Sequence, residues 1–228
     1  MGDETNQLRQ AAYTTTRPDV FLMVPAEAQY ILDVGCSNGA LGASLRAAAL
    51  GRRVTGIEYD AELSAEARTR LDCVIQADLN RFDWEVDFSG QYFDCIIFSD
   101  VLEHLVDPEG LLKVAQKYLK VGGCFVISLP NIRHVSALLS IFGQGTFPRR
   151  DRGIFDRTHL RWFTIQDARR LLSDVGMLVE DASYSLRVRD RGDGLANKLA
   201  RKLLGPLQAV RPVHEFLAYQ FCLRAVRR

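Results

Sequence analysis

Short apolar runs alternate with amphipathic helical patterns from residue 30 to about residue 130. Strands are predicted at Tyr30–Val34, Arg53–Glu58, Cys73–Asp78, Tyr92–Ser99 and Cys124–Leu129. Between them, helices are predicted at Leu41–Leu50, Ala61–Arg70 and Pro108–Leu119. This alternation indicates βαβ units and a parallel sheet, and the almost entirely apolar run Phe93–Phe98 is typical of a strand covered on both faces. The fold class expected is α/β.

The alternation pauses after Pro130. Residues 131–163 carry a predicted short helix, Val135–Phe142, and then glycines, a proline and a group of arginines. A connection of this length is usually functional or disordered. We therefore expect an inserted segment that covers the acceptor, that is, the molecule bound at the strand tips. The pattern then resumes with a helix at Thr164–Val175 and two closing strands at Met177–Leu186 and Phe216–Val226.

Length and charge fit one decorated α/β domain. The chain has 228 residues, 47% of them hydrophobic, and a net charge of +1. This balance gives no reason to expect a nucleic-acid partner. We expect a cap segment over residues 1–29 and the main domain over 30–228, with inserts at 131–163 and 187–213.

Residues 187–213 are basic, with seven Lys or Arg against two Asp. The amphipathic stretch Asn197–Leu204 within them is interpreted as a surface helix, with peripheral contact to an anionic membrane as the alternative. The five cysteines have no metal-ligand spacing, which favours free thiols in a reducing compartment and predicts no metal. The polar N-terminus and the lack of a long apolar run predict a cytoplasmic protein, at the inner face of the membrane if that contact exists.

Carboxylates follow successive predicted strands. The segment Ile31–Gly42 combines a strand with a glycine turn, Glu58 ends the second strand and Asp78 ends the third. Ligands of open α/β sheets bind beyond these carboxyl ends, so the pattern predicts a site for a nucleoside cofactor. Glu58 would bind the ribose hydroxyls and Asp78 the adenine amino group. The residues expected to contact the cofactor are Tyr13, Arg17, Asp33, Gly35, Cys36, Ser37, Gly39, Glu58, Tyr59, Asp78, Leu79 and Ser99.

This ordered set resembles the class I S-adenosylmethionine (SAM)-dependent methyltransferase family. Asp33, Gly35 and Gly39 match its first motif, whereas Ser37 stands where many members have glycine. The resemblance implies SAM as cofactor and a Rossmann-like sheet of order 3-2-1-4-5-7-6 with strand 7 antiparallel. Tyr13 and Arg17 could fold over the cofactor, and Arg17 could pair with its carboxylate, because a guanidinium matches the geometry of that group.

A narrower resemblance is to a bacterial subgroup often encoded beside glycosyltransferases. The segments that carry it are Tyr13–Asp19, Asp100–Leu105, Ser128–His134 and Gly153–Thr164. It implies O-methylation of a sugar hydroxyl in polysaccharide biosynthesis, on a glycan or a nucleotide- or lipid-diphosphate-linked sugar. It implies a glycosyltransferase as partner, and it leaves the oligomeric state open.

A sugar hydroxyl is a poor nucleophile, so a general base is expected. His104 and His159 are the candidates, and His214 is given little weight. The residues expected to bind the acceptor are His134, Arg149, Arg152, Asp156, Arg157 and Arg161. The alternative for the arginines is a solvated face.

Other interpretations remain open. Glu103 and His104 could bind a divalent cation, although neighbours on a helix point about 100° apart. The rival enzymes are a small-molecule methyltransferase of quinone or natural-product synthesis and an NAD-dependent dehydrogenase, for which no catalytic arrangement is found. A non-catalytic SAM-fold partner of a glycosyltransferase is the last alternative.

Overall fold

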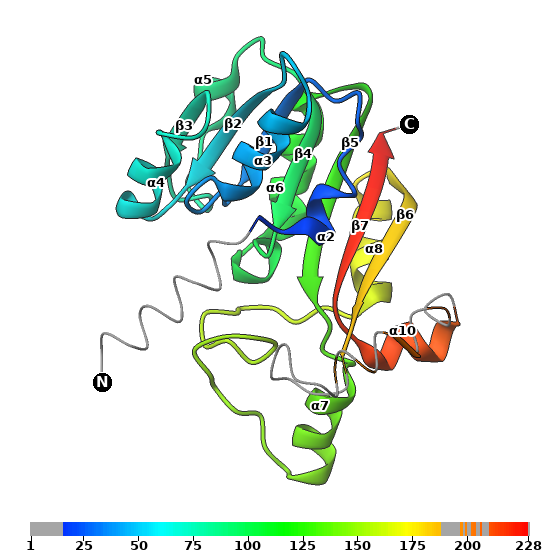
Figure 1. The fold of residues 1–228 in the computed structure, drawn as a ribbon. Helices are drawn as coiled ribbons and strands as arrows, with labels where there is room; N and C mark the ends of the chain where they lie inside the picture. Colours follow the sequence, from blue (N-terminus) through cyan, green and yellow to red (C-terminus); the bar gives the residue numbers. More distant parts are fainter. Residues whose placement is uncertain are drawn as a thin grey trace.

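A seven-stranded sheet with the order β3-β2-β1-β4-β5-β7-β6 forms the centre of the molecule (Figure 1). The computed structural model describes residues 16–187, 197, 199, 202–203, 206 and 210–227. The strands are β1 Tyr30–Val34, β2 Arg53–Glu58, β3 Cys73–Gln76, β4 Phe93–Ser99, β5 Leu119–Pro130, β6 Met177–Leu186 and β7 Ala218–Arg227. Strand β7 is antiparallel to both of its neighbours, which confirms the predicted α/β fold and strand order.

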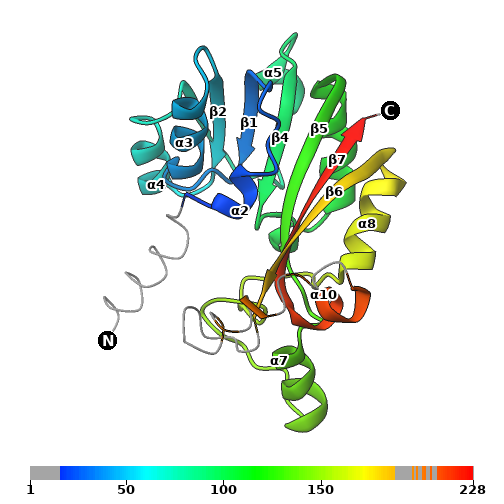
Figure 2. The same ribbon diagram turned by 45° about the vertical axis from the view of Figure 1, so that its right-hand side comes forward.

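Helices cover both faces of the sheet (Figures 1 and 2). The described helices are α2 Pro18–Phe21, α3 Ala40–Ala48, α4 Ala61–Ala67, α5 Trp84–Phe88, α6 Pro108–Ala115, α7 Val135–Leu138, α8 Ile165–Asp174 and α10 Arg211–Leu217. Of these, α7 and α10 lie beyond the carboxyl ends of the strands and do not cover the sheet. Successive strand residues point to opposite faces, so β1 sends Ile31 into the core under α2 and α3 and Leu32 into the core under α6 and α8. Both cores bury their side chains almost completely.

Several predicted elements differ from the structure. The helix predicted to end at Leu119 ends at Ala115, and β5 begins at Leu119 and not at Cys124. The apolar run Phe216–Val226 is not one strand, because residues up to Leu217 belong to α10 and β7 begins at Ala218. Pro212 fits the first turn of that helix, where its missing N–H costs nothing. The helix expected at Val135–Phe142 is one α-helical turn, α7, followed by a π-helical turn over Leu139–Gly143.

The segment 131–163 extends beyond the carboxyl ends of the strands, as the predicted insert should (Figure 1). Buried Asn131 anchors its start by donating to the carbonyls of Glu215 and Ala218 at 2.9 Å. Near its end, the backbone N–H groups of Leu160 and Arg161 donate to the Glu103 carbonyl. These anchors tie the insert to the tips of β4 and β7.

Some predicted features lie outside the described residues. They are Tyr13 and most of the basic segment 187–213, including most of Asn197–Leu204. Among the described residues, no helix is long and apolar enough to cross a membrane.

Candidate active site at the strand tips

A turn with left-handed backbone joins β1 to α3. Gly35, Ser37 and Gly39 have φ values of 73°, 51° and 78°. A Cβ on Gly35 would lie 2.6 Å from Val101 Cγ2, so no other residue fits there without movement. The N–H groups of Gly35 and Cys36 both donate to the Ile57 carbonyl and hold the turn against β2. The backbone is therefore open to a ligand, while the Cys36 side chain is buried below it.

Glu58 lies at the tip of β2 and is fixed by backbone donors. The N–H groups of Ser37 and Asp60 donate to its two carboxylate oxygens at 2.7 and 2.9 Å. Asp78, beyond β3, accepts from the backbone and side chain of Asn80 through one oxygen, Oδ1. A cavity of about 740 Å³ runs past these tips, lined among others by Gly35, Ser37, Glu58, Tyr59, Asp78, Leu79 and Ser99.

This cavity fits SAM. Carboxylates are present where ribose and adenine donors would lie, and the glycine turn leaves room for the methionine end. Gly39 lets the turn pack closely against α4, because a Cβ at this position would lie 3.2 Å from the Ala67 backbone. Of the residues expected to contact the cofactor, all described ones except Gly39 line this cavity or the adjoining one.

Arg17 differs from its expected role. Its Nε and Nη2 donate to Asp19, Nη1 donates to Ser99 and Asp100, and Nη2 also donates to Ser128. A guanidinium has five N–H donors, so none is left for a cofactor carboxylate in this arrangement. Burial opposes the charge, but Asp100 and Asp19 outweigh it and raise the Arg17 pKa. The residue clamps α2 to the tips of β4 and β5.

Asp33 lies beneath the turn, with 1% of its surface exposed and Oδ2 without a partner among the described residues. Burial, and then the charge of Glu58, raise its pKa from 3.8 to about 7. A raised pKa means that folding favours the protonated acid. The resulting stability is fully present below pH 3.8 and is lost as the pH rises through about 7.

We therefore expect Asp33→Asn to be more stable than the wild type at pH 8, by up to about 4 kcal/mol. The difference should shrink steadily as the pH falls from about 7 towards 3.8, because the folded wild-type acid is then protonated at a decreasing cost. Urea unfolding at several pH values measures it. The exposed Asp87→Asn should leave the pH dependence unchanged, and equal stability of Asp33→Asn and wild type at pH 8 would contradict the assignment.

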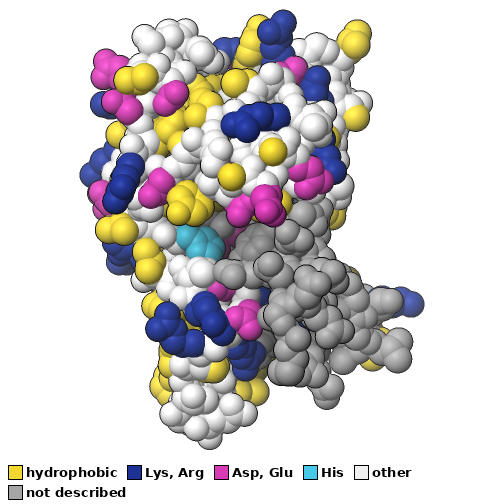
Figure 3. All heavy atoms as spheres, turned by 90° about the vertical axis from the view of Figure 1, so that its left-hand side faces the viewer, with side chains coloured by type: hydrophobic (Ala, Val, Ile, Leu, Met, Phe, Trp, Pro, Cys, Tyr) yellow, Lys and Arg dark blue, Asp and Glu magenta, His cyan; other side chains and the backbone are white. Residues whose placement is uncertain are grey.

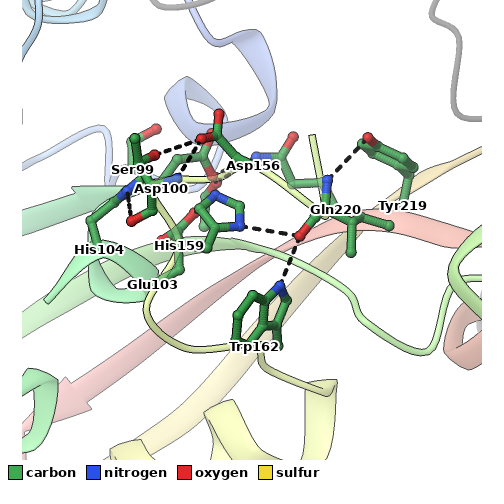
Figure 4. Close-up of polar contacts among 12 residues, drawn as sticks. Ser99, Asp100, Glu103, His104, Asp156, His159, Trp162, Tyr219 and Gln220 are labelled. Atoms are coloured by element: carbon green, nitrogen blue, oxygen red, sulfur yellow. Dashed lines mark hydrogen bonds and ion pairs between the residues drawn. The ribbon is translucent and has the colours of Figure 1, made fainter. Parts of the chain in front are cut away.

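The two candidate bases meet beside the acceptor side of the site (Figure 4). His104 ends the 3₁₀ helix η1 Leu102–His104, and its ring centroid lies 4.8 Å from that of His159. His104 Nδ1 faces the Thr158 carbonyl at 3.2 Å, and His159 Nδ1 faces the Ile154 carbonyl at 3.1 Å. A carbonyl only accepts, so each Nδ1 donates, and in the neutral form of each ring Nε2 carries the lone pair.

Glu103 lies next to His159 and so gives the two histidines different surroundings. It is 1% exposed, and its Oε1 lies 4.0 Å from His159 Nε2. Burial, and then Asp100, raise the Glu103 pKa, while burial, and then His104, lower that of His159. One nitrogen of each histidine and a Glu103 oxygen lie within 4.8 Å of one another, so the divalent-cation alternative gains a third donor. His159 Nε2 thus faces a carboxyl group, whereas His104 lines both cavities.

A second cavity, of about 190 Å³, adjoins the first on the acceptor side. Its acceptor-side lining comes from the tips of β4, β5, β6 and β7 and from the insert, and includes Pro130, Arg152, Asp156, Arg187, Tyr219 and Gln220. Burial alone would raise the Asp156 pKa, but hydrogen bonds from Thr158 lower it overall. The acceptor side is therefore polar.

Four residues expected to bind the acceptor are used elsewhere. His134 is fully buried, caps α7 and bonds to the Arg187 carbonyl at 2.8 Å. Arg149 donates to the Arg157 carbonyl, and Arg157 pairs with Asp151 at 2.6 Å. Arg161 donates to the carbonyls of Leu105 and Val106. None of the four lines either cavity, because each stabilises the fold of the covering segment.

Asp100, Tyr219 and Gln220 are among the residues of this side that sequence reasoning missed, together with Pro130 and Arg187. Asp100 has φ 56° and accepts from Arg17, Ser128 and Gln220. A left-handed aspartate at a strand end is an uncommon strained conformation that often marks a functional site, but nothing in the sequence shows it. Tyr219 and Gln220 lie inside an ordinary apolar run, so their place at the site depends on the antiparallel β7.

Residues 8–181 match the family described as "Methyltransferase domain". The chain is 32% identical over 117 residues to the ubiquinone biosynthesis O-methyltransferase of Xanthomonas oryzae pv. oryzae (strain PXO99A), covering 50% of this chain and 48% of that one. The corresponding enzyme of Hydrogenovibrio crunogenus is 34% identical over 119 residues, covering 51% and 48%. The chain thus matches about half the length of these relatives.

The fold is also shared with solved structures. Magnesium protoporphyrin IX methyltransferase from Synechocystis PCC 6803, crystallised with bound S-adenosylhomocysteine (SAH), superposes with a TM-score of 0.61 at 17% identity. The match covers 95% of this chain and 84% of that one. With the strand order, the glycine turn and the carboxylates at the strand tips, these matches show that the chain belongs to the methyltransferase-domain family and has the fold of class I SAM-dependent methyltransferases.

Proposed function

We propose that this methyltransferase methylates a hydroxyl oxygen of a small biosynthetic molecule. The observation that carries the proposal is the position of His104, whose ring lines both the cofactor and the acceptor cavities while its Nδ1 faces a backbone carbonyl. The relatives named as O-methyltransferases of ubiquinone biosynthesis support oxygen as the acceptor atom and a small molecule as the substrate.

SAM, when bound, supplies a methyl group activated by its sulfonium. The protein aligns the acceptor, excludes water and removes a proton. Glu58, Asp78 and the Gly35–Ser37 backbone would hold the cofactor. His104 Nε2 would take the hydroxyl proton, while its Nδ1–H bond to Thr158 fixes the ring. Alignment of this kind accounts for about 7–11 kcal/mol of a barrier in well-oriented reactions.

O-methylation of a sugar is the second candidate. The polar acceptor side, with Arg152, Asp156 and Gln220, favours an acceptor rich in hydroxyl or charged groups. A partner glycosyltransferase and a role in polysaccharide synthesis belong to this candidate and rest on the sequence resemblance.

Transfer of labelled methyl from SAM to a small panel tests both candidates. Catechol and 3,4-dihydroxybenzoate offer phenolic hydroxyls, and methyl glucoside and UDP-glucose offer sugar hydroxyls. We expect an O-methyl product with a phenolic acceptor, identified by mass and NMR. Product from the sugars alone would replace the first candidate by the second. Transfer to nitrogen, or no transfer to any of the four by protein that binds SAH, would contradict the proposal.

A further inference from the structure

Two arginines that line the acceptor cavity have no anionic partner among the residues that the structure describes. Arg152, on the insert, has no hydrogen bond or ion pair with any residue that the structure describes. Arg187 lies just beyond β6. Within the described chain, its guanidinium makes only a cation–π contact, 4.7 Å from the centroid of the Tyr219 ring. A guanidinium that lines a cavity without an acceptor is ready to bind an oxyanion.

The other arginines of the covering segment are all engaged. Arg149, Arg157 and Arg161 bind backbone carbonyls or Asp151, and Arg150 lies over the ring of Phe155 at 5.8 Å. Basic side chains gather on the lobe below the exposed histidine in Figure 3. Arg152, which lines the cavity, therefore differs from these arginines of the insert in having no hydrogen-bond or ion-pair partner among the described residues.

The carboxylates of the cavity do not neutralise this pair. Asp100 is bound by Arg17, and Asp156 accepts from both the N–H and the hydroxyl of Thr158. Asp33 and Glu103 are each 1% exposed. No carboxylate of the described chain forms an ion pair with Arg152 or Arg187, so no such ion pair competes with a ligand for either guanidinium.

The position of Arg187 favours the acceptor over the cofactor. Its strand, β6, is the edge strand, separated from β1 by β4, β5 and β7. At the usual strand spacing, this separation is about 19 Å within the sheet. Arg187 thus reaches the cavity from the side opposite to the glycine turn, where the acceptor would lie.

We propose that Arg152 and Arg187 form an oxyanion site that binds a carboxylate or phosphate group of the acceptor, next to the hydroxyl that is methylated. The inference rests on the proposed function and narrows its substrate to an anionic molecule. The two arginines bind the anion from different segments, so both are needed. They act on acceptor affinity and take no part in proton removal.

Binding to the full-length, SAH-loaded protein tests the site directly. The probes are inorganic pyrophosphate and 3,4-dihydroxybenzoate, measured by calorimetry, with catechol as the neutral match. We expect at least one anion to bind the wild type, and Arg152→Gln and Arg187→Gln each to weaken it about tenfold, as the loss of a charge-assisted bond predicts. Arg68→Gln, which removes an exposed charge at the C-cap of α4 that lines neither cavity, should bind like the wild type. The tighter probe identifies the oxyanion as phosphate or carboxylate.

The same variants distinguish the acceptor from the cofactor, whose methionine end also carries a carboxylate. SAH affinity should stay within about twofold of the wild type. A tenfold loss of SAH affinity in either variant would overturn the proposal, as would equal anion binding by wild type and variants or no anion binding at all. Methylation of catechol without preference for 3,4-dihydroxybenzoate would reject the anion site and leave the methyltransferase function intact. Anion binding without any O-methyl product would reject the proposed function alone.

Discussion

Replacing His104 by alanine should lower kcat by about 10²–10⁴-fold, the usual contribution of a positioned base, while leaving SAH affinity unchanged. The effect follows from geometry, since the Thr158 carbonyl fixes the proton on Nδ1 and leaves Nε2 as the acceptor. His159→Ala should lower kcat less, because its Nε2 faces Glu103. Single-turnover rates with a phenolic acceptor measure both.

The control is His214→Ala, whose ring stacks on Tyr184 at 4.5 Å and lines neither cavity. Added imidazole should restore part of the turnover of His104→Ala and none of that lost in other variants, which a purely structural role would not produce. Full turnover in both His104→Ala and His159→Ala would remove the base assignment.

Replacing Gly35 by valine should abolish cofactor binding, with a loss of more than about 100-fold in SAH affinity. A side chain there meets Val101 at 2.6 Å and requires φ near 73°, which a β-branched residue does not tolerate. Calorimetry with SAH on the folded variant measures the loss. Gly90→Ala, also at positive φ but with nothing near its Cβ position, separates backbone strain from loss of the cradle.

The prediction is contradicted if Gly35→Val is folded, as judged by circular dichroism, and binds SAH within threefold of the wild type. The glycine turn would then not be the part of the site that binds the methionine end of the cofactor. A Gly35→Val variant that unfolds is replaced by Gly35→Ala, for which the same clash with Val101 predicts a smaller but measurable loss.

The sheet could be predicted because its strands are short apolar runs bounded by turns. β1, β2 and β6 begin and end at the predicted residues. α5 was missed because Trp84–Phe88 is a single short turn, although Asp83 caps it well. The start of β7 was missed because an apolar run does not reveal where a helix gives way to a strand.

The cofactor side of the site was predictable because Asp33, Glu58 and Asp78 lie at or just beyond the ends of three strands, and strand tips meet at one edge. The acceptor side was predictable only in part, since Arg152 and Asp156 line its cavity while the other four residues expected there do not. His104 and His159 are 55 positions apart in sequence, and Arg187 and Gln220 come from still later segments. Which arginines are free follows from contacts such as Arg157 with Asp151, which no spacing reveals.

The insert is anchored at both ends by backbone carbonyls, through Asn131 at its start and through Leu160 and Arg161 at its end. These contacts do not depend on the side chains that lie between the two anchors. A chimaera that exchanges residues 135–157 while keeping both anchors should inherit a foreign substrate preference without disturbing cofactor affinity. The substrate range of this protein can therefore diverge by replacement of the insert, while the part of the molecule that binds the cofactor stays unchanged.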